Sequence, residues 1–186
     1  RMVPGLRHQG VVARCLGSPT TASVDALVTN LDHPAFLLIL DGVQDPRNLG
    51  ACMRCADAAG VDAIVVPADN ACDITPVVSK VAAGATHSVP YFRVSNLRRT
   101  LSALKEQGVW IVGTSDQAES TLWRSDLSGP IAVVLGAEGK GLRRLTQEHC
   151  DFLVSIPMLG HVQSLNVSVA AGVVLYEALR QRRAAG

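Results

Sequence analysis

The sequence predicts an α/β fold in which a mostly parallel sheet carries helices on both faces. Continuous apolar runs such as "FLLIL" (36–40) are typical of strands that are buried on both faces. Segments with helix caps and stops separate these runs, so strand and helix alternate along the chain. A composition of 48% hydrophobic residues, with only 4% aromatic residues, also favours this alternation over an all-β or disordered chain.

The elements follow one another regularly from residue 36 onward. Gly60 and Gly108 are predicted to stop the helices that precede them. Thr75 is predicted as an N-cap with Pro76 in the first helical position, and Ser95 as the next N-cap. Strands are expected at 36–40, 61–67, 88–94, 109–114, 131–136 and 152–157, and helices at 49–60, 75–85, 95–108, 142–150 and 164–183.

Residues 1–35 differ from the rest. "GVVARC" (10–15) is predicted as a short strand, and residues 17–34 as a loop and a short helix that ends at Pro34. We therefore expect residues 1–35 to combine a linker with the start of the main domain, which spans 36–186. No apolar run reaches the ~18–20 residues of a membrane span, and the first residues lack the apolar segment of a signal peptide.

The cysteines and the net charge limit the classes of protein to which this chain can belong. The five cysteines are an odd number without signs of secretion, which indicates reduced thiols and a cytoplasmic protein. Cys52 and Cys55 form a C-x-x-C pair inside a predicted helix, with no second pair at zinc spacing, so we expect buried thiols and no metal. A net charge of +1 neither requires nor excludes nucleic acid. The arginine pairs at 98–99 and 143–144, taken alone, are typical of solvated helix faces.

Ligands of parallel sheets bind outside the carboxyl ends of the strands. This rule selects four loops, which contain "DPRN", "GTSD", "GAEGKG" and "PMLGHVQSLN". In the first loop and the helix after it, Asn48 could cap that helix, and Gly50 could permit close packing. Arg54 could pair with a buried carboxylate or bind a phosphate, and both interpretations remain open.

The loop "LGAEGKGL" (135–142) allows a tight turn and a close approach of its backbone to a ligand. It matches neither the Walker A loop nor the G-x-G-x-x-G fingerprint of dinucleotide-binding proteins. Glu138 is the one acidic residue in the loop. It is either a carboxylate placed at a helix start, where the dipole favours it, or a carboxylate directed at a cleft.

The last loop leads into the final helix through "GHVQSLNVSVAAG" (160–172). Ser164 is predicted as the N-cap of this helix. The helix is apolar nearly all round, so Asn166 near its start needs hydrogen-bond partners. Ser168 is interpreted as a satisfied helix hydroxyl. Capping therefore explains Ser164 well and Asn166 only in part.

Together, "NLGACMRCADAAGV", "LGAEGKGL" and "SIPMLGHVQSLNVSVAAGVVLYEALRQ" resemble the three motifs of the SpoU family of RNA ribose 2′-O-methyltransferases. The resemblance covers roughly residues 36–183. "RHQGVVAR" and "RLTQEHCD" are most similar to family members that methylate a guanosine of 23S rRNA. The resemblance to the family implies a deep trefoil knot near the C-terminus, which the periodicity of the sequence does not predict. It also implies a homodimer through helices that include the last one, and an RNA-binding domain before residues 1–35.

The resemblance further implies S-adenosylmethionine as the methyl donor and a set of site residues. The catalytic positions of the family fall on Asn48, Arg54, Glu138, Ser164 and Asn166. The cofactor positions fall on Thr114, Leu135, Gly136, Ile156, Met158, Ser164 and Leu165. Gly136 suits the cofactor because a side chain there would block it, and Ile156 and Leu165 would form apolar walls.

The implied reaction is an in-line attack of a ribose 2′-oxygen on the sulfonium methyl group. An arginine is almost always protonated, so we expect Arg54 to bind an RNA phosphate and stabilise developing negative charge. Glu138 is then the base or a partner that orients Arg54, and Asn48 and Asn166 position these groups. The alternatives are the same chemistry on tRNA, a non-catalytic RNA-binding homologue, and a dinucleotide-dependent oxidoreductase, against which the missing fingerprint argues.

Overall fold

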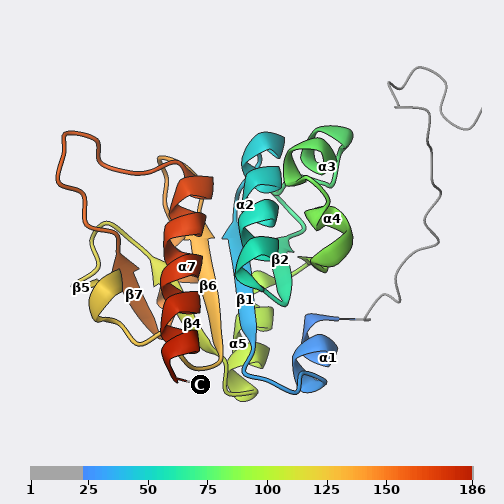
Figure 1. The fold of residues 1–186 in the computed structure, drawn as a ribbon, viewed down its shortest axis with the longest axis horizontal. Helices are drawn as coiled ribbons and strands as arrows, with labels where there is room; N and C mark the ends of the chain where they lie inside the picture. Colours follow the sequence, from blue (N-terminus) through green and yellow to red (C-terminus); the bar gives the residue numbers. More distant parts are fainter. Residues whose placement is uncertain (1–22, 186) are drawn as a thin grey trace, which may run out of the picture.

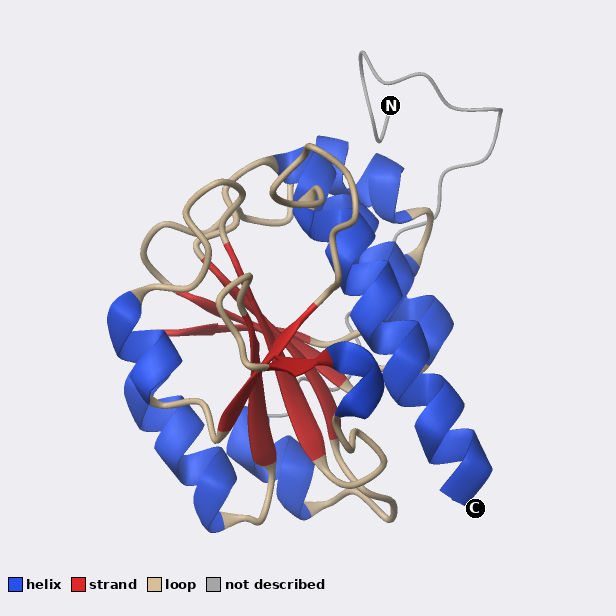
Figure 2. Ribbon diagram, turned by 90° about the vertical axis from the view of Figure 1, so that its left-hand side faces the viewer, coloured by secondary structure: helices blue, strands red, loops and turns tan. Residues whose placement is uncertain are grey.

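The computed structural model describes residues 23–185, which form three layers with the sheet in the middle (Figures 1 and 2). The predicted strand at 10–15 lies outside the described residues. In chain order the elements are α1 (Val24–Thr29), β1 (Phe36–Asp41), α2 (Pro46–Ala59), β2 (Ala63–Pro67), α3 (Pro76–Ala82), α4 (Ala85–Ser88), β3 (Tyr91–Val94), α5 (Leu97–Glu106), β4 (Trp110–Thr114), β5 (Ser120–Thr121), η1 (Leu122–Arg124), β6 (Ile131–Gly136), α6 (Arg144–Glu148), β7 (Phe152–Ser155) and α7 (Val167–Ala185).

The seven strands pair in the order β3-β2-β1-β6-β4-β7-β5, and every pairing between them is parallel. This confirms the predicted sheet. All strands therefore end at the same edge, toward which the arrows of β1 and β6 point in Figure 1. The register places Asp41, the last residue of β1, beside Gly136, the last residue of β6. The ends of these central strands thus lie next to each other.

Helices cover both faces of the sheet, as predicted. Alternate side chains of β1 serve the two cores, because successive strand residues point to opposite faces. Leu38 packs in the core that contains α2, α3, α4 and α7, whereas Leu37 packs in the core that contains α5. All six residues of β1 are buried, which explains the continuous apolar run over residues 36–40, and the sixth residue, Asp41, is a buried carboxylate.

Helix α2 starts three residues earlier than predicted. Asp45 is its N-cap and accepts a hydrogen bond from the Arg47 N–H at 2.7 Å, and Pro46 fits the first helical position because it needs no amide hydrogen. The interpretation of Asn48 as a cap is therefore wrong. The predicted packing role of Gly50 is confirmed, since a Cβ there would lie 2.7 Å from the Cβ of Val81 on α3.

Two further helix boundaries differ from the prediction. Thr75 caps α3 as predicted, but the helix breaks at Ala83 and Gly84, which adopt left-handed φ angles of 52° and 107°. Residues 85–88 form the separate helix α4. The cap of α5 is Asn96, whose side chain accepts from the Arg99 N–H, rather than Ser95. Both residues are good caps, so local sequence does not distinguish them.

The C-terminal knot stays a prediction. Helix α6 is shorter than the predicted 142–150, because the Gly-rich loop continues to residue 143. The short elements β5 and η1 were not predicted, since two and three residues carry no periodicity. Within residues 23–185, no helix is both long and apolar enough to cross a membrane.

Candidate functional site

A cavity of about 470 Å³ opens at the carboxyl ends of the strands. The loops after β4, β6 and β7 form its walls, and the first residues of α7 close one side. Three of the four loops that the strand-end rule selects therefore surround one cavity. Its size is within the range of sites for small molecules and cofactors.

All seven residues predicted to bind the cofactor line this cavity, and they come from β4, β6, the loop after β7 and its continuation toward α7: Thr114, Leu135, Gly136, Ile156, Met158, Ser164 and Leu165. Sequence reasoning missed six polar lining residues: Ser115, Asp116, Gln117, Lys140, Gln147 and Gln163. Gln147 lies on α6, and the other five lie in the selected loops. That position was the available signal, because nothing in their own side-chain type distinguishes them from surface residues.

Gly136 has a packing role that differs from the predicted one. A Cβ at this position would lie 2.0 Å from the backbone carbonyl group of Gly141, which is far inside van der Waals contact. The Gly-rich loop turns back on itself here, and the Gly141 N–H donates to the carbonyl oxygen of Ala137 at 2.9 Å. The glycine is therefore required to close the loop, whether or not a ligand also approaches it.

A buried ion pair holds the far end of the Gly-rich loop. The carboxylate of Asp41 is fully buried at the end of β1, and it accepts hydrogen bonds from the backbone N–H of Arg143 at 3.3 Å and from its Nε at 2.6 Å. A second guanidinium nitrogen of Arg143 completes the pair. Because Asp41 lies beside Gly136 in the sheet, both ends of the loop are anchored at one point.

Three predicted catalytic residues meet at the mouth of the cavity. The Nδ2 of Asn48 lies 3.3 Å from Oε2 of Glu138, and the Nδ2 of Asn166 lies 3.3 Å from the same oxygen. Asn166 Nδ2 also donates to Oδ1 of Asn48 at 3.0 Å. Glu138 is a loop residue that lines the cavity, so the interpretation as a helix-start carboxylate is wrong. The two amides hold Oε2 of Glu138 in place, and the other oxygen of the carboxylate, Oε1, stays available to other partners.

Asn166 also caps the final helix. Its Oδ1 accepts from the Ser168 N–H at 2.9 Å and from the Ser168 hydroxyl at 2.7 Å, and its carbonyl oxygen accepts from the Ala170 N–H. The prediction of Ser164 as the cap is therefore wrong, since α7 starts at Val167. With acceptors on one side of its amide and donors on the other, Asn166 has one orientation. The prediction of Ser168 as a satisfied helix hydroxyl is confirmed, and its hydrogen bond helps to hold Asn166.

The structure does not bring the other two predicted catalytic residues into this cluster. Ser164 is exposed and lines the cavity. Arg54 is exposed on α2, six residues after Asn48, which corresponds to roughly 9 Å along the helix axis and a different face. No hydrogen bond or ion pair joins Arg54 to a described residue of the cluster.

The cysteines of α2 do not form a reactive pair. Burial raises the pKa of Cys52 to about 12, and it also raises the pKa of Cys55 above its ordinary value. The thiolate is the reactive form of cysteine, so both thiols are structural. In the described part of the chain, His, Cys, Asp and Glu form no group of three or more that could hold a metal ion.

The arrangement suits an amphipathic ligand and a proton transfer. Leu135, Ile156 and Leu165 provide apolar walls, while Thr114 and Glu138 add polar groups. A carboxylate with one oxygen fixed and one available can accept a proton from a hydroxyl group that reaches the cavity mouth. The site therefore combines a pocket for a small molecule with a carboxylate held by two amides.

Comparison with protein families and known proteins gives a consistent result. The model of the SpoU rRNA Methylase family matches residues 35–176. A 23S rRNA (guanosine-2′-O-)-methyltransferase RlmB from Shewanella oneidensis is 60% identical over 179 residues, which cover 95% of this chain and 72% of that protein. The Escherichia coli protein of the same name is 55% identical over 180 residues, covering 96% and 74%.

Solved structures agree. The SpoU methyltransferase AviRb from Streptomyces viridochromogenes, solved in complex with AdoMet, is similar with a TM-score of 0.79 and 29% identity. The match covers 88% of this chain and 66% of AviRb. The TrmH/SpoU tRNA modifying enzyme of A. aeolicus has a TM-score of 0.74 and 34% identity, covering 81% of this chain and 77% of its own.

Proposed function

The chain belongs to the SpoU rRNA methylase family, and from this premise we propose that it methylates a ribose 2′-hydroxyl of a guanosine in 23S rRNA. The proposed methyl donor is S-adenosylmethionine. Two sequence relatives at 55–60% identity are named for this activity, and one similar structure was solved with this cofactor. The observation that carries the proposal is Glu138, which lines the cavity and is also held by Asn48 and Asn166.

The cavity fits the proposed cofactor. An adenosine needs apolar walls and backbone partners, which Leu135, Ile156 and Leu165 and the loops around them can supply. Gly136, Gly139 and Gly141 have no side chains, so the backbone of the Gly-rich loop borders the cavity directly at these positions. When bound, S-adenosylmethionine supplies an electrophilic methyl group on a positively charged sulfur.

Glu138 is the proposed proton acceptor. Asn48 and Asn166 both donate to its Oε2, which leaves Oε1 available to take the proton of the ribose 2′-hydroxyl. The expectation that Glu138 orients Arg54 receives no support, since no contact joins them within the described residues. We keep for Arg54 the role of a cation that binds an RNA phosphate and stabilises negative charge on the attacking oxygen.

Two variants test these roles. Arg54→Ala should abolish methyl transfer while leaving the S-adenosylmethionine affinity nearly unchanged, because Arg54 does not line the cavity. Glu138→Gln should lower kcat by about 100-fold or more with a similarly small effect on cofactor affinity. Isothermal titration calorimetry measures the affinity and tritium transfer measures kcat. Loss of cofactor binding in Arg54→Ala would mean that Arg54 is structural.

The RNA target is tested by its product. The full chain is incubated with S-adenosylmethionine and unmodified transcripts of 23S rRNA or tRNA, and ribose methylation is mapped by mass spectrometry. A methylated guanosine in the 23S transcript alone supports the proposal. Methylation of tRNA would favour the alternative function, which is the same chemistry on tRNA; the similar A. aeolicus protein is named as a tRNA modifying enzyme. Absence of methyl transfer to either RNA, with RNA binding retained, would favour a non-catalytic homologue.

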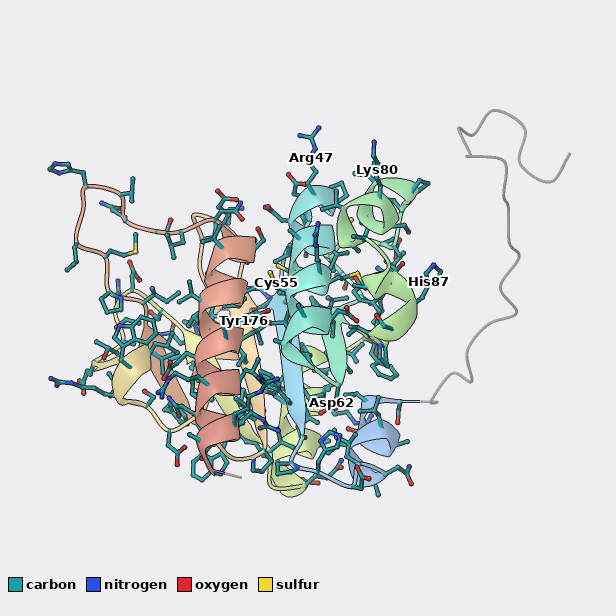
Figure 3. The ribbon with its side chains drawn as sticks, in the orientation of Figure 1. Arg47, Cys55, Asp62, Lys80, His87 and Tyr176 are labelled. Atoms are coloured by element: carbon teal, nitrogen blue, oxygen red, sulfur yellow. The ribbon has the colours of Figure 1, made fainter. Side chains whose placement is uncertain are left out.

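We also propose that the chain is a homodimer through α7. Val169 and Tyr176, both 51% exposed, lie seven residues apart on the outer face of this helix, with half-buried Val173 between them. Figure 3 shows Tyr176 on α7 and Cys55 on the neighbouring helix α2. An apolar stripe on a helix favours a protein interface. Tyr176→Glu should convert a dimer to a monomer in light scattering, and a wild-type monomer would contradict the proposal.

Two further expectations complete the proposal. Residues 1–35 would combine a linker from an N-terminal RNA-binding domain with the start of this domain, to whose core Val24 and Ala35 belong. A substrate in ribosomal RNA supports a location in the cytoplasm.

A further inference from the structure

A second groove of about 470 Å³ lies at the same edge of the sheet as the cofactor cavity. The loop after β2, the first turn of α5 and the start of α6 form it. Its lining residues are Pro67, Asp69, Ser95, Asn96, Leu97, Arg98, Arg143, Arg144, Leu145 and Thr146. The two arginine pairs of the sequence, which alone are typical of solvated helix faces, thus contribute three side chains to one concave surface.

The three guanidinium groups differ in whether a carboxylate of the protein already pairs with them. Within the described residues, no carboxylate lies within 4.0 Å of the Arg98 side chain. Arg144 pairs with Glu148, but its side chain is 80% exposed, and such surface pairs contribute little stability. Arg143 is held by buried Asp41, yet its side chain remains 50% exposed. Arg98 and Arg144 therefore have hydrogen-bond donors available for an anion.

The helix behind the groove adds positive potential. Arg98 lies in the first turn of α5, which has ten residues and no acidic residue in that turn. A positive side chain near the positive end of a helix dipole is unfavourable, and an anion in the groove would relieve it. Asp69 is the one acidic lining residue and opposes such binding. The groove has no aromatic side chain among its lining residues, so it offers no surface on which a base could stack.

The groove and the cofactor cavity meet along the chain. Leu142 lines the cofactor cavity and the next residue, Arg143, lines the groove. We propose that the groove binds a backbone phosphate of the substrate RNA, with Arg98 and Arg144 as its ligands. The inference rests on the proposed function. It assigns a contact that positions RNA without reading its sequence.

Arginine variants test the groove in the full chain. Arg98→Ala and Arg144→Ala should each raise the KM for a 23S rRNA transcript by about fivefold and leave cofactor affinity unchanged. Each should also reduce the slope of log K against log salt by roughly 0.7–0.9, measured by filter binding of the transcript. Arg99→Ala is the matched control, because Arg99 is exposed in the same helical turn but does not line the groove.

Removing a negative charge from the groove, instead of a positive one, gives a second test. Asp69→Asn should tighten RNA binding, because it removes the groove's negative charge. Weaker binding of this variant would overturn the inference. So would an effect of Arg99→Ala equal to that of Arg98→Ala, which would indicate general positive charge. If the wild-type chain methylates the transcript and the arginine variants match it in KM and salt slope, the groove fails alone. If the wild-type chain neither binds nor methylates RNA, the proposed function fails with it.

Discussion

Two substitutions of Asn166 separate its role as a helix cap from its role beside Glu138. Asn166→Ala removes the acceptor of the Ser168 N–H and both contacts of the amide with Asn48 and Glu138. Asn166→Ser keeps a side-chain oxygen that can cap the helix, but it has no NH2 group and is too short to reach Glu138. The two variants therefore differ in the cap alone.

The hydrogen bonds set the expected size of each effect. Loss of a cap costs about 1 kcal/mol, and loss of the two amide contacts, at 3.0 and 3.3 Å, adds roughly 0.5–1 kcal/mol each. For a chain of this length 1 kcal/mol corresponds to about 2–4 °C in Tm. Asn166→Ala should thus lower Tm by roughly 4–12 °C, and Asn166→Ser by about 2–4 °C less.

Activity should respond differently from stability. Both variants lose the same hydrogen bond to Oε2 of Glu138, which at 3.3 Å is worth roughly 0.5–1 kcal/mol. Both should therefore lower kcat by about 2- to 5-fold, measured by tritium transfer to a 23S rRNA transcript. Wild-type kcat in either variant would refute the role of Asn166 in holding Glu138. Equal Tm values for the two variants would refute the cap.

Three further substitutions test the loop and the fold. Gly136→Ala should abolish cofactor binding in calorimetry, because a Cβ would collide with backbone 2.0 Å away; unchanged affinity would contradict the closed loop. Arg143→Ala should lower the free energy of unfolding by about 2–4 kcal/mol in urea titrations, since it leaves the buried carboxylate of Asp41 without its ion-pair partner. Hydrogen bonds from Arg180 lower the pKa of Glu177 to about 2 from 4.5. This carboxylate therefore stabilises the fold above about pH 4.5, and the contribution is lost between pH 4.5 and 2. Glu177→Gln should flatten the pH dependence of Tm there, and an unchanged profile would refute the ion pair.

Helix boundaries show where local sequence is insufficient. Ser95 and Asn96, or Ser164 and Asn166, are all good caps, so propensity does not choose between neighbours. The structure selects Asn96 and Asn166 because their side chains reach free backbone N–H groups. The same limit applies to the arginine pairs. A sequence shows that arginines are adjacent, but only the fold shows that Arg98 and Arg144 line one groove.

The sequence by itself determined the alternation of strands and helices and the loops that carry the site. These features follow from short-range patterns, since buried parallel strands are continuously apolar and ligands bind where such strands end. The seven residues expected to bind the cofactor came from the family resemblance, and all of them line the cavity. The tertiary structure alone decided the strand order and the contacts of Glu138. Its partners Asn48 and Asn166 lie 90 and 28 residues away, and Asp41 lies 102 residues from Arg143. The periodic pattern of a sequence relates only nearby residues, so it does not predict contacts at such separations. These loops come together because strands β1 and β6 pair in parallel.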